Sequence, residues 1–199
     1  EVADGAWAVV VGDVCGRGPD AAALTGLVRH SVRTAVVRER VPSRILALAN
    51  DAVLGQIDDA RFCTAAFLRV VVAPGGGGAT VTASSAGHPR PVLLRADGTT
   101  SLLDCAGVLI GVVPSPPLVD LDVALAPGDA VVLYTDGVTE ARRGRELFGD
   151  GRLLETVQGL AGASAEALAR GIEDAVVAFQ EGATDDVAIV ALRVPAAAG

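Results

Sequence analysis

Residues 6–19 read AWAVVVGDVCGRGP, and this stretch decides the fold. Its first half is rich in valine and predicts a strand over Ala6–Val14. Its second half is a glycine loop that carries Asp13 and ends at Pro19, a residue suited to the first turn of a helix. The sequence therefore predicts a strand that delivers a carboxylate to a loop, directly before a helix.

The two segments after this loop have helical periodicity. Apolar residues recur every three to four positions from residue 24 to residue 35 and again from residue 45 to residue 57. Ser43 is expected to cap the second helix. The predicted apolar face of that helix consists of Ile45, Leu48, Ala49, Ala52, Val53 and Ile57. Two helices thus follow one strand, on one side of whatever comes next.

The middle of the chain consists of predicted strands and tight turns. Strands are expected over residues 62–72, 79–86, 91–95, 100–103, 119–125 and 130–134, with a glycine turn at 75–78. Two more helices are expected over 151–160 and after the N-cap residue Ser164, followed by a last strand over 187–194. Strands joined by short turns are antiparallel. Runs of strands between helix pairs indicate an α+β fold, with two packed sheets and helices outside.

Composition and charge exclude several classes of protein. The 199 residues suit a single domain over 1–199 with a frayed tail at 195–199, and 51% hydrophobic residues exclude a disordered chain. The net charge of −8 argues against binding to nucleic acid or to an anionic membrane. The sequence predicts no transmembrane helix and no signal peptide. Cys15, Cys63 and Cys105 lie far apart in apolar contexts. They predict buried free thiols in a reducing, cytoplasmic compartment.

Acidic residues stand at the ends of three predicted strands. Asp13 ends the first strand, Asp136 follows the strand over 130–134, and Asp185 with Asp186 begins the last one. Such carboxylates are costly unless something offsets their charge, and hard cations such as Mg²⁺ and Mn²⁺ take oxygen ligands. A glycine beside Asp13 and Asp136 lets backbone and water approach closely. The pattern therefore favours a divalent cation site.

Other polar residues have weaker claims to a functional role. Asp4 and Asp97 also precede glycine, but their neighbours indicate ordinary hairpin turns. His88 stands in a turn after a strand, where a histidine either fixes the turn or donates a proton to a leaving group. Arg17 in the glycine loop could contact a phosphate, although one loop arginine is weak evidence. His30 and the arginines around it indicate a solvated helix face.

Four motifs, in this order, resemble a known family. They are VGDVCGRG at 11–18, SAGHP at 85–89, LYTDGVTE at 133–140 and TDDVA at 184–188. Together they are similar to the PPM (PP2C-type) metal-dependent serine/threonine phosphatases, in the bacterial branch that includes SpoIIE and RsbU. Each motif alone is a weak signal, but four in the right order, over residues 6 to 194, are a strong one.

The resemblance implies a fold and a metal site. The fold would be a four-layer αββα sandwich of two antiparallel sheets flanked by helix pairs. Two Mn²⁺ or Mg²⁺ ions would be held by Asp13, the backbone carbonyl of Val14, Asp136 and Asp185, with Asp186 as the alternative if the register slips by one. In this family the two metals clamp a phosphate and activate a water, so no nucleophilic side chain is needed. The resemblance thus makes Asp13, Asp136 and Asp185 the catalytic residues, which would act through the metal-bound water.

The resemblance also implies a substrate and partners. The chain would hydrolyse phosphoserine or phosphothreonine in a phosphoprotein. In this branch the substrate is typically an anti-anti-sigma factor, a small STAS-domain protein, so the role would be regulation of a sigma-factor pathway. An upstream sensor domain is expected in the full-length protein, and the oligomeric state stays open, a homodimer included. The alternatives are a catalytically degraded regulatory module with the same fold, and a metal-dependent phosphatase for small molecules.

The chain departs from the family pattern at its start. Family members carry another acidic motif, of GGDxxD type, on the strand before the first hairpin, and twelve residues precede Asp13 here. Asp4 lies in the expected hairpin turn and is a poor substitute. We therefore expect an N-terminally truncated domain, with weak metal binding and with the pairing strand of Ala6–Val14 missing.

Overall fold

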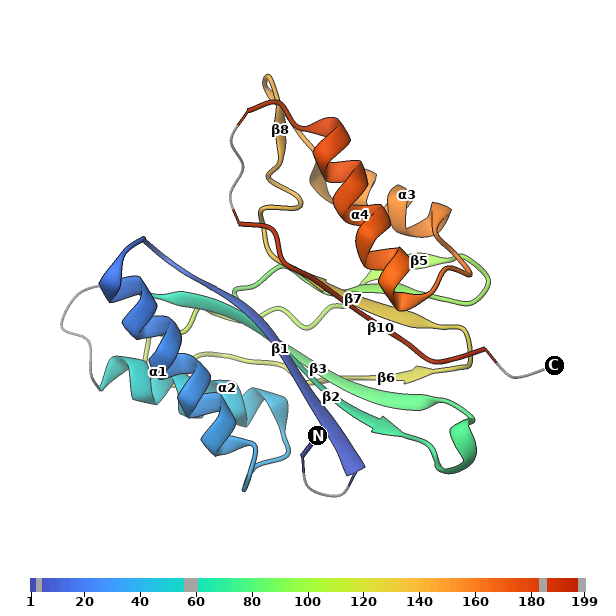
Figure 1. The fold of residues 1–199 in the computed structure, drawn as a ribbon. Coiled ribbons are helices and arrows are strands. Elements are labelled where there is room, and N and C mark those ends of the chain that lie inside the picture. Colours follow the sequence, from blue (N-terminus) through green and yellow to red (C-terminus); the bar gives the residue numbers. More distant parts are fainter. Residues whose placement is uncertain (3–4, 56–60, 183–185, 197–199) are drawn as a thin grey trace. The chain divides into compact units, whose positions relative to one another are not determined.

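The computed structural model describes residues 1–2, 5–55, 61–182 and 186–196. Within these ranges the chain forms four α-helices, two four-stranded sheets and a two-stranded hairpin (Figure 1). It divides into two compact units, each of which is described by itself. The first unit is Glu1–Val72, Thr80–Arg90 and Asp104–Val123, and the second is Ala73–Ala79, Pro91–Leu103 and Ala124–Gly199.

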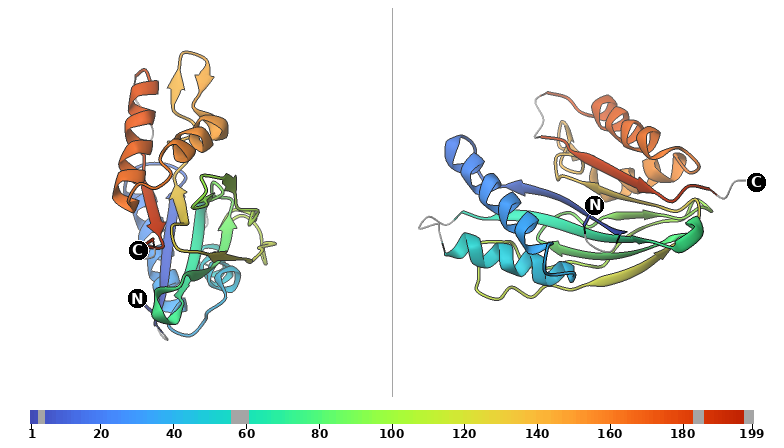
Figure 2. Two further views of the ribbon diagram at one scale, coloured as in Figure 1. Left: turned by 90° about the vertical axis from the view of Figure 1, so that its right-hand side faces the viewer. Right: turned by 60° about the horizontal axis from the view of Figure 1, so that its bottom comes forward.

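The first unit carries the sheet with the strand order β1-β2-β3-β6 and the helices α1 and α2. The bounds are β1 Ala6–Val14, α1 Pro19–Ala35, α2 Pro42–Leu54, β2 Cys63–Val72, β3 Ala79–Ala86 and β6 Leu121–Leu125, with β3 and β6 each crossing the unit boundary near one end. The two helices pack on each other, and both contact the sheet, α1 at β1 and α2 at β2 (Figure 2).

One face of this sheet and the two helices share a hydrophobic core. Its fully buried members include Leu24, Ile45, Leu46, Val53, Cys63, Ala65, Phe67 and Ile110. The strand residues Cys63, Ala65 and Phe67 alternate along β2, as expected for side chains on one face of a strand. The predicted strand over Ala6–Val14 and the helix that begins at Pro19 are confirmed in type and position.

The second helix differs from its prediction at two points. Ser43 does not cap it, because Val41 is the N-cap residue and no side chain caps this end. Instead, both the backbone N–H and the hydroxyl of Ser43 donate to the carboxylate of Asp120, at 2.8 and 2.5 Å. Leu48 is 49% exposed, whereas Leu46 is fully buried. Ile57, the last residue of the predicted face, lies outside the described residues.

Asn50, the only asparagine of the chain, anchors the irregular connection before β6. Its side chain is fully buried, donates to the carbonyl of Val113 at 3.2 Å and accepts from the N–H of Gly111 at 2.9 Å. Gly111 has a φ of 90°, and a Cβ there would meet Val53 Cγ1 at 2.7 Å. The buried amide therefore continues the anchoring of this segment beyond the isolated backbone bridge between Cys63 and Ile110.

The second unit carries the other sheet, in the strand order β10-β7-β4-β5, and two helices. The bounds are β4 Val92–Leu94, β5 Thr100–Leu102, β7 Ala130–Tyr134, β8 Arg142–Arg143, β9 Glu146–Leu147, α3 Gly149–Gly159, α4 Ala165–Phe179 and β10 Ile189–Arg193. The neighbours in this sheet pair antiparallel, β7 with β10 and β4 with both β5 and β7. Helix α4 packs on β10 and α3 on β4 and β5.

The core of this unit lies between the sheet and its helix pair. It contains Val92, Leu94, Ala130, Val132 and Tyr134 from the strands and Leu153, Val157, Leu168, Ile172 and Val176 from the helices. Ser164 caps α4 as predicted, since its hydroxyl accepts from the N–H of Ala167 at 3.1 Å. The expected fold class, with two antiparallel sheets and four helices, is confirmed.

Two further expectations were wrong or incomplete. Cys15 is exposed, whereas Cys63 and Cys105 are buried free thiols as predicted. The hairpin of β8 and β9 was not foreseen, because its four residues are exposed and have no apolar periodicity. No helix in the ranges that the structure covers is both long enough and apolar enough to cross a membrane.

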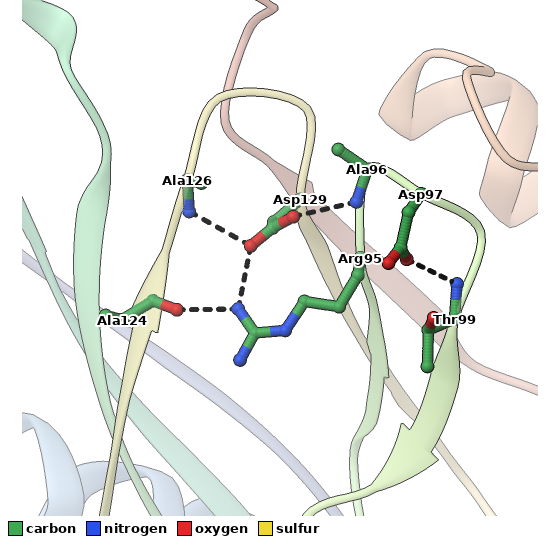
Figure 3. Close-up of polar contacts among 7 residues, drawn as sticks. All are labelled: Arg95, Ala96, Asp97, Thr99, Ala124, Ala126 and Asp129. Carbon is green, nitrogen blue, oxygen red and sulfur yellow. Dashed lines mark hydrogen bonds and ion pairs between the residues drawn. The ribbon is translucent and has the colours of Figure 1, made fainter.

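Asp129 joins the turn after β4 to its own turn, between β6 and β7 (Figure 3). Its carboxylate accepts from the Arg95 guanidinium at 2.7 Å and from the backbone N–H groups of Ala96 and Ala126 at 2.8 and 3.0 Å. The same Arg95 nitrogen donates to the carbonyl of Ala124 at 2.8 Å. The residue is 3% exposed, so these bonds satisfy a carboxylate that water scarcely reaches.

These contacts also set the ionisation of Asp129. Burial alone would raise its pKa, but the hydrogen bonds from Arg95 and the two backbone N–H groups, with the charge of Arg95, outweigh it and lower the pKa. The carboxylate therefore contributes stability that is complete above about pH 4, the usual aspartate pKa. That contribution is lost as the pH falls through the lowered pKa of the folded state.

We predict that Asp129→Asn lowers the free energy of unfolding at pH 7 by about 1–3 kcal/mol, because the amide NH₂ group cannot accept the hydrogen bonds that the buried carboxylate accepts. Urea denaturation of both chains would measure this difference, which should shrink as the pH falls below 4. Asp97→Asn is the matched control, since Asp97 is an exposed turn residue whose carboxylate accepts from the Thr99 N–H at 2.8 Å and pairs with no arginine in the described ranges. A destabilisation equal to that of the control would contradict the prediction.

Candidate functional site

One group of candidate residues lies in the first unit, at the end of β1. The antiparallel register places Asp13 opposite Thr64 and Val14 opposite Cys63 on β2. Val14 and Cys63 belong to the core under α1 and α2. Because side chains alternate along a strand, those of Asp13 and Thr64 share the other face of the sheet. Asp13 is exposed there, which leaves its carboxylate open to a ligand.

Gly12 is required by the neighbouring strand. A Cβ at this position would lie 2.5 Å from the carbonyl oxygen of Thr64, closer than any real contact of that kind. The sequence suggested that this glycine admits backbone and water near Asp13. The structure shows that the approaching backbone is that of β2. Gly12 therefore holds the pairing that fixes where Asp13 leaves the strand.

His88 is held in a turn beside Thr64. It is 5% exposed, and its Nδ1 lies 2.8 Å from Thr64 Oγ1. The hydroxyl of Ser85 donates to the His88 carbonyl at 2.8 Å and accepts from the His88 N–H at 3.2 Å. His88 thus takes part in fixing the turn, which is one of the two roles considered for it above. Thr64 connects it to the strand position opposite Asp13, a link that the sequence did not reveal.

The glycine loop after Asp13 is exposed. Gly16 and Gly18 have φ values of 102° and 87°, which favour glycine, and Arg17 between them is exposed. Arg17 is therefore accessible to a ligand.

The buried cysteines do not supply a nucleophile. Burial, with a contribution from the negative charge of Asp13, raises the pKa of the Cys63 thiol to about 12. Burial raises the pKa of Cys105 to about 11. Since the thiolate is the nucleophilic form, both groups are unreactive near neutral pH. Neither buried thiol is therefore a candidate nucleophile.

A second group of candidate residues lies in the other unit, at the end of β7. Asp136 follows this strand and starts a tight turn, in which its carbonyl accepts from the N–H of Glu140 at 2.7 Å and from the hydroxyl of Thr139 at 3.3 Å. The Val138 N–H donates to the Thr135 carbonyl at 3.1 Å. These bonds engage the backbone of Asp136 and leave its half-buried carboxylate free.

Thr135 ties the segment after the double aspartate to this turn. Its hydroxyl donates to the carbonyl of Asp186 at 2.9 Å and accepts from the N–H of Ala188 at 2.9 Å. The Thr135 N–H donates to the Ala188 carbonyl at 3.0 Å. Asp136 and Asp186 are thus brought to the same end of the β7–β10 pair. Asp185, the preferred ligand of the sequence analysis, lies outside the described residues.

Each of the free carboxylates, that of Asp13 in the first unit and that of Asp136 in the second, is by itself a suitable ligand for a hard divalent cation. Asp120, Asp122 and Asp129 accept hydrogen bonds from Ser43, Thr82 and Arg95. In the described ranges no donor or cation bonds to the carboxylate of Asp13 or Asp136. Anionic oxygens of this kind are the ligands that Mg²⁺ and Mn²⁺ prefer. Those ranges contain no group of three metal-ligating side chains, and Asp13 and Asp136 belong to different units.

The elements and motifs described above define a protein of the PP2C phosphatase fold. The solved structure of the SiaA-PP2C domain of Pseudomonas aeruginosa superimposes with a TM-score of 0.81, at 24% identity, over 97% of this chain and 77% of that one. The family profile of stage II sporulation protein E (SpoIIE) matches residues 3–195. The chain therefore belongs to the SpoIIE family.

Two curated relatives are similar in sequence. The phosphoserine phosphatase RsbU of Bacillus subtilis (strain 168) is 25% identical over 187 residues, which cover 93% of this chain and 55% of RsbU. Protein IcfG of Synechocystis sp. (strain ATCC 27184 / PCC 6803 / Kazusa) is 27% identical over 178 residues, 75% of this chain and 27% of IcfG. The chain thus spans about half or less of the length of these relatives.

We predict that Thr135→Val loosens the segment after the double aspartate. The substitution keeps the side-chain shape but removes the hydroxyl that bonds Asp186 and Ala188, so the free energy of unfolding should fall by about 1–3 kcal/mol. Amide hydrogen exchange at Ala188 should become faster than in the wild type. Thr135→Ser, which keeps the hydroxyl, should retain the slow exchange. Equal exchange in all three proteins would refute the anchoring role.

Proposed function

We propose that this chain is a metal-dependent protein phosphatase domain that hydrolyses phosphoserine or phosphothreonine. The observation that carries the proposal is the pair of uncompensated carboxylates, Asp13 and Asp136, each placed at a strand end by a constrained backbone. Membership of the SpoIIE family and the similarity to the phosphoserine phosphatase RsbU support it.

The residues that would hold two Mn²⁺ or Mg²⁺ ions are Asp13, the carbonyl of Val14, Asp136 and Asp185, with Asp186 as the alternative. Such ions, when bound, supply a Lewis acid for the phosphate and lower the pKa of a water. The work of the chain is to orient these oxygens. The β1–β2 pairing orients Asp13. The hydrogen bonds of Thr135 and of the Asp136 carbonyl orient Asp136 and the segment that carries Asp186.

Two other side chains are candidates for contact with the phosphoprotein. Arg17 presents an exposed guanidinium in the loop after Asp13, where a fork-shaped cation suits a phosphate. His88 is a candidate for proton transfer to the leaving oxygen, and its hydrogen bond to Thr64 fixes its ring.

The proposed substrate is a phosphorylated anti-anti-sigma factor, a STAS-domain protein, in a pathway that controls a sigma factor. This assignment follows from the family and from the likeness to RsbU. An upstream sensor domain in the full-length protein would regulate the activity. We place the domain in the cytoplasm, because Cys63 and Cys105 are free thiols.

Phosphate release with Mn²⁺ tests the activity. The full-length natural chain should hydrolyse p-nitrophenyl phosphate and a serine-phosphorylated STAS-domain protein, and EDTA should abolish both reactions. Asp136→Asn should lower kcat/KM by about 100-fold or more, because a metal ligand is lost. Asp97→Asn is the control, because Asp97 also precedes a glycine but lies in an ordinary turn, and it should leave the rate unchanged. An inactive wild-type chain would refute the proposal.

Metal binding separates the proposal from its alternatives. In calorimetry, Mn²⁺ should bind the wild-type chain and bind Asp13→Asn much more weakly. A chain that neither binds Mn²⁺ nor releases phosphate would instead be a regulatory module that keeps the fold. A chain that prefers a nucleotide to the phosphoprotein by kcat/KM would be a small-molecule phosphatase.

A further inference from the structure

A groove on the exposed face of α1 gathers basic side chains. Its walls include Arg29, His30, Arg33, Thr34, Val37 and Arg38, and its volume is about 770 Å³. All six residues are exposed. Positions 29, 30, 33, 34 and 37 follow helical spacing, so they form one continuous stripe. We call this feature the α1 groove.

The arginines of the α1 groove have no carboxylate partners. Arg29, Arg33 and Arg38 make no ion pair within the described ranges. Other arginines of the protein do form ion pairs, for example Arg61 with Asp20 at 2.9 Å and Arg170 with Glu166 at 2.8 Å. Among the residues described, no acidic side chain lines the groove. Three cations are thus left uncompensated in a protein whose net charge is −8.

This charge pattern favours an acidic protein segment as the occupant. Arg29 and Arg33 lie on α1 and Arg38 lies three residues after its end, a span of about two and a half helical turns, so a single phosphate could not meet all three guanidinium groups. The net charge of −8 disfavours nucleic acid and anionic membranes, which repel the rest of the surface. Val37, which is 72% exposed, adds an apolar contact that a peptide can use. A second hollow, lined by Val32, Val36 and Phe67, adjoins the groove at Arg33 and Val37.

The α1 groove also lies on the helix that starts directly after the Asp13 loop. Helix α1 begins at Pro19, and Arg29 is ten residues further along, a distance of about 15 Å at 1.5 Å per residue. An extended peptide covers that distance in about five residues. A segment bound in the groove could therefore be part of the molecule whose phosphate reaches Asp13.

We propose that the α1 groove binds acidic side chains of the phosphoprotein substrate, near the phosphorylated residue in its sequence. This inference rests on the proposed phosphatase function and adds a determinant of substrate choice to it. Exposed complementary charges act mainly on encounter rates and specificity. The groove should therefore raise kcat/KM for acidic substrates without changing the turnover of a small one.

Synthetic phosphoserine peptides test the proposal on the full-length natural chain with Mn²⁺. One peptide carries three glutamates about five residues from the phosphoserine, and its partner carries three glutamines there. The wild-type chain should have a kcat/KM about tenfold higher for the glutamate peptide at low salt, an advantage that shrinks in 0.5 M NaCl. The double variant Arg29→Glu/Arg33→Glu should lose this preference and hydrolyse p-nitrophenyl phosphate at the wild-type rate.

A matched control has the same change of charge elsewhere. The double variant Arg145→Glu/Arg170→Glu alters two exposed arginines of the second unit and should keep the preference for glutamate. Equal rates on the two peptides, with hydrolysis of p-nitrophenyl phosphate intact, would overturn the docking role alone. A preference lost equally in both double variants would also overturn it. A wild-type chain without any phosphatase activity would overturn the proposed function and this inference together.

Discussion

The pairing of β1 with β2 is the constraint on which the first unit depends. Nine residue pairs join the two strands, from Ala6 with Val71 to Val14 with Cys63. A slip of one residue would turn Asp13 into the core under α1 and α2 and bring Val14 out. Gly12 protects the pairing, because only a residue without a side chain fits beside the Thr64 carbonyl. The same pairing sets the point at which the chain leaves the sheet and enters α1.

In the second unit, the strand ends are held by side chains that hydrogen-bond to the backbone. Asp129 fastens the turns next to β4 and β6, and Thr135 fastens the segment that leads into β10. Both are buried polar residues whose hydrogen bonds are made within the unit. They hold the strand ends in place, while the carboxylate of Asp136 is left without a partner among the described residues. A polar group that is satisfied supports the fold, and one left free is available for chemistry.

Charged side chains likewise divide into those that have bonding partners in the fold and those that do not. Carboxylates that stabilise the structure, such as Asp120 and Asp129, accept several hydrogen bonds. Arginines that stabilise it lie beside them or beside carbonyl groups, as Arg95 does. Two arginines without an ion pair in the described ranges, Arg29 and Arg33, lie on α1, in a helix whose opposite face is buried by Leu24, Val32 and Ala35. One helix thus packs on the sheet that carries Asp13 and presents a basic face outward.

The sequence by itself determined the element types, the family and the identity of the acidic residues. Valine-rich strands, a 3.6-residue period and the Pro19 and Ser164 signals are local properties, so β1, α1 and α4 could be predicted closely. Tertiary structure decided which side chains act together. That Ser43 binds Asp120 rather than capping α2, that Gly12 faces Thr64, and that Thr135 holds the Asp186 segment all depend on residues far apart in the chain. No local pattern encodes these contacts, because they arise only when strands and turns pair across the fold.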